Sequence, residues 1–214
     1  MNLAELKDQL YVAVLSDVLD QMGYKHQATR ITFHAYTGVT KLIGRCKTTL
    51  WADMYDVDKS PYELELKAVD SCQPGDILIA AAGGSNRSGI WGELLSTAAR
   101  NCGCEGTIVH GAVRDIDKMR EMGFPVFATS KNPYDSQNRQ RVIDVDVIVE
   151  IDGVKFSPGD IVMADEDGIV VVPREIEEQV IKAALEKVNA ENITRDAIKG
   201  GMKAMDAYLK YGVL

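Results

Sequence analysis

The chain has 214 residues, which is within the usual range for one domain, and 46% of them are hydrophobic, an ordinary fraction for a globular protein. Its formal net charge of −8 argues against general binding of nucleic acid, which favours a basic face. The N-terminal residues carry charges throughout and lack a cleavage site of small residues, and no apolar run approaches the ~20 residues of a membrane helix. We therefore expect a single-domain cytoplasmic protein, residues 1–214.

The first segment with a clear period is residues 3–22. Apolar side chains recur there at intervals of three and four, which predicts one amphipathic helix that ends at Gly23. Alternatively, Ser16 and Asp17 cap a second short helix that begins at Val18, after a bend.

The region before the centre of the chain predicts short strands and one helix. Glycines separate apolar segments that suit strands at residues 31–33, 39–42 and 44–50. A polar, acidic stretch, residues 51–60, leads to Pro61, and proline suits the first turn of a helix over 61–72. A Pro-Gly-Asp turn then precedes an apolar run, 77–82, which is typical of a strand buried on both faces.

The centre of the chain predicts a parallel crossover unit. A glycine-rich loop enters a helix over residues 91–101, and a tight turn leads to a strand over 107–110. Strand, helix and strand within ~40 residues indicate a right-handed parallel connection. A short helix over 115–122 and a strand over 124–128 extend the same sheet.

The last third of the chain predicts antiparallel strands and then helices. Alternating apolar and acidic residues over 142–151 indicate a strand with one solvated face. Turns separate two further strands, at 161–164 and 169–172. A long helix over 175–199 and a short one over 202–210 follow. Because this C-terminal extension, residues 175–214, goes beyond a compact core, we expect it to contact a neighbouring subunit.

Together these patterns predict an α/β fold with a mostly parallel central sheet, a second antiparallel β layer and outer helices. The start of the helix at Gly92-Glu93 and the end of the strand at Arg114-Asp115 are expected to face one another, since ligands of α/β proteins bind at the carboxyl edge of the sheet. The first N–H groups of a helix can hold a carboxylate or phosphate, and an arginine can grip a carboxylate with two hydrogen bonds. Asp115 could bind a metal.

Structural explanations of the same residues stay open at this point. The glycines could serve only to let the helix pack close to the sheet, and Arg114 with Asp115 could be an ion pair that caps the next helix. No dinucleotide-binding or Walker pattern and no serine nucleophile elbow is present.

The cysteines and histidines do not suggest a zinc site. Cys102 and Cys104 form a C-x-C pair without a second pair or a neighbouring histidine, and we interpret all four cysteines, which include Cys46 and Cys72, as reduced packing or surface residues. The three histidines, His26, His34 and His110, are scattered. A bound metal would therefore have carboxylate and water ligands, which favours magnesium or manganese.

The spacing of these residues resembles that of a known family. Glu93 is followed, after twenty intervening residues, by Arg114-Asp115, and this pattern is similar to the acid-x20-Arg-Asp motif of the class II pyruvate aldolases of the RraA-like family. Other segments also resemble this family: GCEGTIVHGAVRD, SDVLDQMG near the N-terminus and ADEDGIVVVP. The resemblance implies a β/β/α swivelling fold and trimers, or dimers of trimers, with sites between subunits.

The resemblance also implies roles for single residues. Arg114 would bind the carboxylate and keto oxygen of a pyruvate unit, and the backbone amides over Gly92, Glu93, Leu94 and Leu95 would hold the same anion. Asp115 would ligate magnesium or manganese directly, and Glu93 through water; many members have aspartate in place of this glutamate. A further acid from the C-terminal helix of a neighbouring subunit would complete the site, with Glu191 as the best match and Glu186 as a weaker one.

The implied activity is cleavage of a 4-hydroxy-2-oxo acid or diacid, such as 4-hydroxy-4-methyl-2-oxoglutarate or 4-carboxy-4-hydroxy-2-oxoadipate, to pyruvate and a second oxo acid. Decarboxylation of oxaloacetate would proceed through the same pyruvate enolate. Some relatives instead regulate a ribonuclease by binding it without catalysis. A chain of that kind would lack the acid pair and would be shorter, so the intact Arg114-Asp115 and the C-terminal helix favour the enzyme.

Overall fold

Four strands with mostly apolar sequences form the parallel centre of the molecule. The computed structural model describes residues 3–213 and places β2 (Leu42–Asp53), β3 (Asp76–Ala81), β5 (Gly106–Val113) and β6 (Val126–Lys131) side by side, each parallel to the next. Residues on both faces of β3 and β5 are buried, as is typical of strands covered on two sides.

Short antiparallel strands extend this centre at its edges. The full strand order is β1-β6-β5-β3-β2-β10-β11, where β1 is His34–Ala35, β10 is Ile161–Asp165 and β11 is Gly168–Val172. The short strand β4 (Gly89–Trp91) runs parallel to the end of β5, and β7 (Gln140–Val145) runs antiparallel to the far half of β2. A separate hairpin of β8 (Val149–Ile151) and β9 (Val154–Phe156) makes the second sheet.

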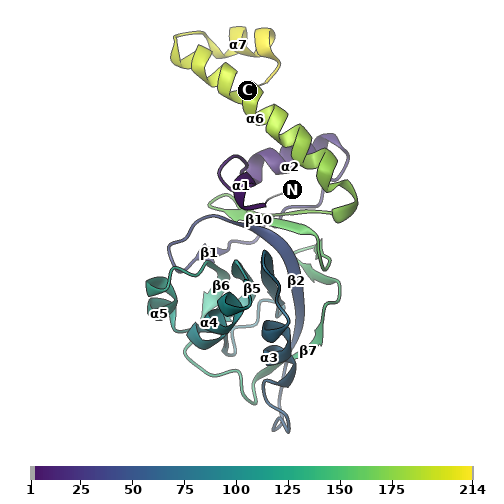
Figure 1. Ribbon diagram of the computed structural model, residues 1–214, viewed down its shortest axis with the longest axis vertical. Helices are drawn as coiled ribbons and strands as arrows, with labels where there is room; N and C mark the ends of the chain where they lie inside the picture. Colours follow the sequence, from purple (N-terminus) through teal and green to yellow (C-terminus); the bar gives the residue numbers. More distant parts are fainter. Residues whose placement is uncertain (1–2, 214) are drawn as a thin grey trace.

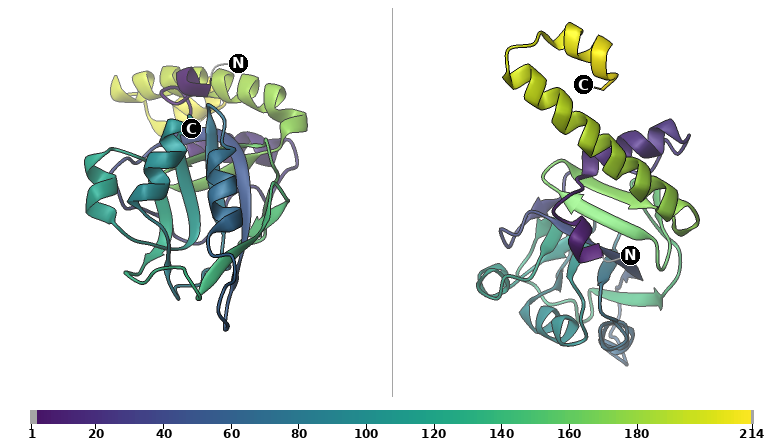
Figure 2. Two further views of the ribbon diagram at one scale, coloured as in Figure 1. Left: turned by 60° about the horizontal axis from the view of Figure 1, so that its bottom comes forward. Right: turned by 45° about the horizontal axis from the view of Figure 1, so that its top comes forward.

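Three layers result, with the central sheet in the middle. Helices α3 (Glu63–Asp70), α4 (Glu93–Asn101) and α5 (Ile116–Glu121) lie together on one face of this sheet (Figure 1; Figure 2, left). The β8-β9 hairpin covers the other face, where Val149, Ile151, Val154 and Phe156 pack against apolar residues of β3, β5 and β6. The predicted α/β fold with a mostly parallel sheet, a second antiparallel sheet and outer helices is therefore confirmed.

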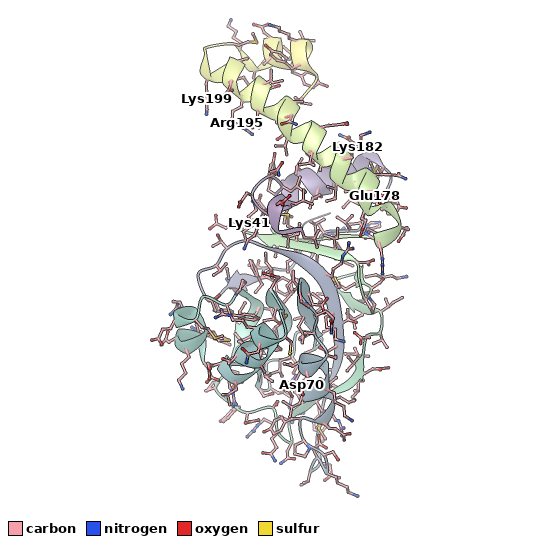
Figure 3. All side chains as sticks on the ribbon, in the orientation of Figure 1. Lys41, Asp70, Glu178, Lys182, Arg195 and Lys199 are labelled. Carbon is pink, nitrogen blue, oxygen red and sulfur yellow. The ribbon has the colours of Figure 1, made fainter. Side chains whose placement is uncertain are left out.

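A further group of helices packs on the β10-β11 end of the molecule. Helices α1 (Leu3–Leu6), α2 (Val12–Gln21) and the first half of α6 (Glu177–Lys199) share an apolar cluster with β10 and β11. The second half of α6 and the short helix α7 (Ala204–Tyr211) stand away from the body as an arm (Figures 1 and 2). Figure 3 labels Glu178 and Lys182 on the half of α6 near the body, and Arg195 and Lys199 on the projecting half. Over the residues that the structure describes, none of the helices has the length and apolar content needed to cross a membrane.

The predicted single helix over residues 3–22 is wrong, and so is the alternative break at Ser16 and Asp17. The chain instead turns between α1 and α2, and α2 begins at Val12. The carboxylate of Asp165, at the end of β10, accepts a hydrogen bond of 2.7 Å from the Val12 N–H and so caps α2 from a distant part of the chain. The period of apolar residues could not predict this helix start, because it depends on a contact with a residue far away in the sequence.

The strand predictions before the centre of the chain also need correction. Residues 39–42 and 44–50 are not two strands, because Gly44 lies inside the continuous strand β2. A Cβ at this position would lie 2.5 Å from the carbonyl oxygen of Gly75, so glycine here allows two backbones to approach rather than ending a strand. The predicted strand over 31–33 is absent, and β1 begins just after it, at His34.

The predicted strand over 142–151 is interrupted. Asp146 has a φ of 56°, which ends β7, and its carboxylate pairs with Lys47 Nζ at 2.7 Å. The chain then enters β8, so the alternating sequence serves two different sheets. The short strands β4 and β9 were not predicted, since three residues are too few to show a period. The ends of the other predicted elements differ from the structure by a few residues.

Candidate active site

The short strand β4 brings the start of α4 to the end of β5. Gly89 and Trp91 of β4 align with Ala112 and Val113 of β5, and the Arg114 N–H donates a hydrogen bond of 2.8 Å to the Trp91 carbonyl. Because α4 begins directly after β4, with Gly92 as its N-cap, the helix start and the strand end are adjacent, as the sequence predicted.

Gly92 is required by the carboxylate that lies against it. A Cβ at Gly92 would be 2.5 Å from Asp115 Oδ2, closer than a carbon and an oxygen can approach. The same Oδ2 accepts a hydrogen bond of 3.3 Å from the Glu93 N–H. Asp115 itself adopts the left-handed conformation, with a φ of 56°, which aspartate tolerates better than most residues. The two halves of the motif are thus in direct contact.

The N-terminal turn of α4 offers backbone donors at this junction. The first intrahelical hydrogen bond runs from the Ser96 N–H to the Gly92 carbonyl, at 3.1 Å, so the amides of Glu93, Leu94 and Leu95 precede it. The Glu93 amide is directed at Asp115, within the chain. The Leu94 side chain is 78% exposed, so the outer side of this turn is accessible.

Arg114 lies between two carboxylates. Its Nε is 3.7 Å from Asp115 Oδ2, and its Nη2 is 3.3 Å from Asp135 Oδ2. Asp135 comes from the polar loop between β6 and β7, and its Oδ1 accepts hydrogen bonds of 2.8 Å from the Tyr62 hydroxyl and from the Gln137 N–H. Burial opposes ionisation of Asp135, but these hydrogen bonds and the charge of Arg114 outweigh it, so the pKa of Asp135 lies below its ordinary value.

Helix α3 contributes a buried acid behind this pair. The Glu65 residue is only 7% exposed, and burial together with the charge of Asp135 raises its pKa to about 8, although Arg114 opposes the shift. Burial and the hydrogen bond to Asp135 likewise raise the pKa of Tyr62 to about 12, so its hydroxyl remains a donor. At neutral pH the Arg114 guanidinium therefore faces ionised Asp135 and mostly protonated Glu65.

The sequence reasoning missed Tyr62, Glu65 and Asp135. One signal was available, because Glu65 occupies the same face of α3 as Ala68 and Val69, and an acid on an apolar face is unusual. Asp135 lies in a loop that carries no motif, so only the folded chain brings it to Arg114.

An open cleft of about 630 Å³ extends from the Arg114-Asp115 pair. Tyr36, Lys131 and Asn132 line its other side. A neighbouring cleft of about 670 Å³ is also lined by Tyr36 and Lys131, so the two hollows adjoin at these residues. This arrangement leaves room for a small acid beside Arg114.

Two neighbouring residues of the loop before β4 lie at different places, one beside this cleft and one on another surface. The backbone carbonyl of Asn86 accepts a hydrogen bond of 2.6 Å from the Asn132 side chain, which lines the cleft. The Arg87 guanidinium instead stacks on the Tyr55 ring, 4.3 Å from its centre. The position of the loop relative to the site could not be predicted from the sequence.

Glu93 and Asp115 are the carboxylates of this junction that suit a divalent metal. Glu93 Oε1 accepts a hydrogen bond of 2.8 Å from the Thr97 hydroxyl one turn along α4. Among residues 3–213, no three histidine, cysteine, aspartate or glutamate side chains cluster as a metal site. Magnesium is commonly held by one or two carboxylates with water and substrate, so this donor set fits it.

Glu191 occupies a different part of the chain. It lies on α6, and its carboxylate accepts a hydrogen bond from the Tyr11 hydroxyl and lies 3.9 Å from Arg195 Nη2. Burial and Glu191 raise the pKa of Tyr11 to about 12. Glu186 is exposed on the same helix. Within one chain, α6 lies across the body from α4 (Figure 1), so a role for either acid at Asp115 stays a prediction about a neighbouring subunit.

The cysteines belong to the packing of the body. All four are free thiols, and Cys46, Cys72 and Cys104 are buried. Burial raises the pKa of the Cys46 thiol well above its ordinary value. Buried thiols of this kind pack as small apolar side chains, as the sequence predicted.

The fold and the site together define a class of protein. It is an α/β protein of three layers, with an arginine and two carboxylates where the first turn of a helix meets the carboxyl end of a parallel strand. The family model described as "Aldolase/RraA", RraA-like, matches residues 12–171. The chain therefore belongs to the RraA-like family.

Individual relatives support this assignment. The chain is 31% identical over 145 residues to a protein of Halalkalibacterium halodurans named "Putative 4-hydroxy-4-methyl-2-oxoglutarate aldolase", a match that covers 68% of this chain and 69% of the relative. Among solved structures, an uncharacterised protein from Pseudomonas syringae pv. tomato has a TM-score of 0.85 at 26% identity, covering 98% of this chain and 93% of that one. RraAS2 of Streptomyces coelicolor, described as an unusual member of the RNase ES inhibitor RraA protein family, has a TM-score of 0.78 at 28% identity and covers 89% of this chain and 96% of its own.

Proposed function

We propose that this protein is a divalent-metal-dependent aldolase that cleaves a 4-hydroxy-2-oxo acid or diacid to pyruvate and a second oxo acid. The observation that carries the proposal is the junction of Gly92-Glu93 with Arg114-Asp115, where Arg114 and Asp115 line an open cleft and the first turn of α4 lies against the Asp115 carboxylate. The aldolase name of the Halalkalibacterium relative supports the same class of reaction.

The chain's own groups suit the pyruvate half of such a substrate. The Arg114 guanidinium would bind the carboxylate and the keto oxygen through the N–H groups that its pairs with Asp115 and Asp135 leave open. The amides of the first turn of α4 would hold the same carboxylate, where the partial positive charge of a helix start favours an anion. The Arg114 side chain is 32% exposed and lines the cleft, so a ligand there can reach it.

The proposed reaction moves one pair of electrons toward the keto oxygen. Loss of the proton from the C4 hydroxyl allows the C3–C4 bond to break, which releases the second oxo acid and leaves a pyruvate enolate. A proton added at C3 then gives pyruvate. In oxaloacetate the bond from C3 to the C4 carboxylate breaks instead, carbon dioxide leaves and the same enolate forms. Arg114 stabilises the enolate charge in both reactions.

Asp115 would hold magnesium or manganese directly, and Glu93 would hold it through water. When bound, the metal supplies Lewis-acid stabilisation of charge on the keto oxygen. Glu93, oriented by the Thr97 hydroxyl, would position a water that carries the proton. An acid from the C-terminal helix of a neighbouring subunit, Glu191 or the weaker candidate Glu186, would complete the site in a homotrimer or a dimer of trimers.

A second candidate function is regulation of a ribonuclease by protein binding, without catalysis. The likeness to RraAS2 of Streptomyces coelicolor favours it. Against it stand the intact Arg114-Asp115 pair and the arm formed by α6 and α7, which a shorter regulator would not need.

An assay of pyruvate release tests the proposal. Oxaloacetate and 4-hydroxy-4-methyl-2-oxoglutarate are each offered to the purified protein, with magnesium or with EDTA, and pyruvate is followed through lactate dehydrogenase. We expect pyruvate from at least one substrate with magnesium and background rates with EDTA. Because oxaloacetate decarboxylates slowly by itself with magnesium, a protein-free reaction is the control. If neither substrate gives metal-dependent pyruvate, the enzymatic proposal fails and the regulatory function becomes the better one.

A further inference from the structure

Besides the residues of the family motif, the site contains an ion pair between Arg114 and Asp135. Asp135 uses its two oxygens for different tasks, since Oδ1 accepts hydrogen bonds from Tyr62 and Gln137 while Oδ2 faces Arg114 Nη2 at 3.3 Å. The Asp135 carboxylate is therefore held on one side before it meets the guanidinium on the other.

The two ion pairs of Arg114 restrict how its guanidinium is presented. Asp115 lies beside Nε and Asp135 beside Nη2, so the nitrogen that these pairs do not occupy is Nη1. A long arginine side chain loses considerable rotational freedom when it binds a small anion, and a guanidinium already held at two nitrogens loses less. Preorganisation of this kind strengthens binding without a new contact to the substrate.

The backbone conformation of Tyr62 also suggests a functional reason for this residue. It is the N-cap of α3, and its backbone has a φ of 65°, in the left-handed region that a bulky residue rarely adopts. Holding such a residue there costs free energy, and strain of this kind gathers at functional sites. Glycine or asparagine would be easier at this position, but neither could carry a phenol to Asp135.

We infer that Asp135, held by Tyr62, is a positioning residue that presents the Arg114 guanidinium to an anionic substrate. The inference rests on the proposed function, since it assumes that Arg114 binds the substrate. The pair itself adds little to stability, because the side chains of Arg114 and Asp135 are 32% and 40% exposed, and ion pairs near the surface contribute little. Its effect should therefore appear in binding rather than in folding.

The alternative is that the ion pair only fastens the loop between β6 and β7. The two roles differ in what they change. A fastening role would lower the melting temperature and leave the affinity of the folded protein for an anion intact. A positioning role would weaken anion binding and leave the melting temperature nearly unchanged.

The test measures binding of oxalate, a planar dianion that resembles the pyruvate enolate, to the magnesium-loaded protein by isothermal titration calorimetry. Three variants are compared with the wild type: Asp135→Asn, Asp135→Glu and Tyr62→Phe. We expect Asp135→Asn to raise the Kd for oxalate about tenfold and Tyr62→Phe about threefold, with melting temperatures close to that of the wild type. Asp135→Glu should recover part of the loss, because it restores the charge.

Tyr134→Phe is the matched control for Tyr62→Phe, since Tyr134 is exposed on the same loop as Asp135 and has its ring against Arg139. It should leave the Kd unchanged. In parallel, the KM for the substrate should rise more than kcat falls in Asp135→Asn, because ground-state binding is what weakens.

The outcomes separate this inference from the proposed function. If the wild type releases pyruvate and binds oxalate, and Asp135→Asn binds oxalate within about twofold of the wild type, the positioning role is wrong while the aldolase stands. If Asp135→Asn lowers the melting temperature markedly while the folded variant keeps the affinity of the wild type for oxalate, the loop-fastening role is correct instead. If the wild type neither releases pyruvate nor binds oxalate, the proposed function itself has failed.

Discussion

The site and the C-terminal arm of this molecule are organised in opposite ways. At the site, Gly92, Glu93, Arg114 and Asp115 touch one another within a single chain, and the approach is so close that no Cβ fits at Gly92. In the arm, apolar side chains of α6 and α7 face solvent: Ile193, Ile198, Met205, Tyr208 and Leu209. The four motif residues therefore contact one another inside one chain. The arm, by contrast, has apolar side chains that none of the described residues buries.

This difference indicates what each region needs in order to function. The Arg114-Asp115 junction can be tested by single substitutions in one chain. The arm presents an apolar surface of a kind that marks protein–protein contacts, and we expect a second copy of the chain to cover it. Four predictions test the two halves of this comparison.

The largest effect is expected from Asp115→Asn. Loss of the carboxylate removes the proposed direct ligand for the metal, so pyruvate release should fall at least about 100-fold and magnesium should no longer stimulate it. The coupled pyruvate assay and a magnesium titration measure both. Asp70→Asn is the matched control, because Asp70 is an exposed aspartate at the end of α3. Retained activity with unchanged dependence on magnesium would remove Asp115 from the ligand role.

Gly92→Ala should have the next largest effect. The new Cβ must displace the Asp115 carboxylate, from which it would otherwise be 2.5 Å, while the helix itself tolerates alanine. We expect about tenfold weaker activation by magnesium and a loss of about 1–3 kcal/mol in stability. Unchanged magnesium dependence in a folded variant would show that the close approach at Gly92 does not matter for the metal.

The arm is tested by the double variant Met205→Lys/Leu209→Lys. Both side chains are exposed, Leu209 by 76%, so the isolated chain should fold as before. Lysine opposes burial in an apolar interface, so the mass in solution should fall from that of an oligomer toward that of one chain. Size-exclusion chromatography with light scattering measures this, and Asp206→Lys in the same helix is the control for added charge. A wild type that is already a monomer would contradict the proposed role of the arm.

The smallest effect on activity is expected from Glu65, whose ionisation changes the stability of the protein with pH. The folded protein keeps a proton on Glu65 up to about pH 8, because burial and Asp135 raise its pKa, whereas the unfolded chain loses that proton near pH 4.5. Between these values the unfolded state binds fewer protons, so the free energy of unfolding should fall as pH rises, by on the order of 5 kcal/mol in all, since one pKa unit corresponds to about 1.4 kcal/mol. Glu65→Gln should lack this decline.

Melting temperatures of the wild type and Glu65→Gln, measured from pH 5 to pH 9, check this expectation. The two curves should be close together near pH 5 and separate through the window, with the wild type becoming the less stable, and then run parallel above about pH 9. Parallel curves over the whole range would mean that Glu65 ionises as it does in the unfolded chain.

Much of the fold could be predicted because the signals are local. The apolar run of β3, the helix α4 and the turns around β10 and β11 have patterns within ten or so residues, and the structure contains each of them. The errors arose where a distant contact overrides a local pattern. Asp165 starts α2 at Val12, and Gly44 continues a strand because it lies against Gly75 rather than ending one.

The sequence was enough to predict that the two halves of the candidate site meet. Glycine at 92 and the spacing of Glu93, Arg114 and Asp115 imply that a helix start meets a strand end, since a parallel crossover returns the chain to the same edge of the sheet. The groups that surround Arg114 are known from the tertiary structure alone. Tyr62, Glu65 and Asp135 come from segments with no shared pattern, and an ion pair between distant loops depends on how α3 and the β6-β7 loop pack. Short-range periodicity carries no information about such packing, so the sequence predicted Arg114 and Asp115 but not the groups that hold the guanidinium in place.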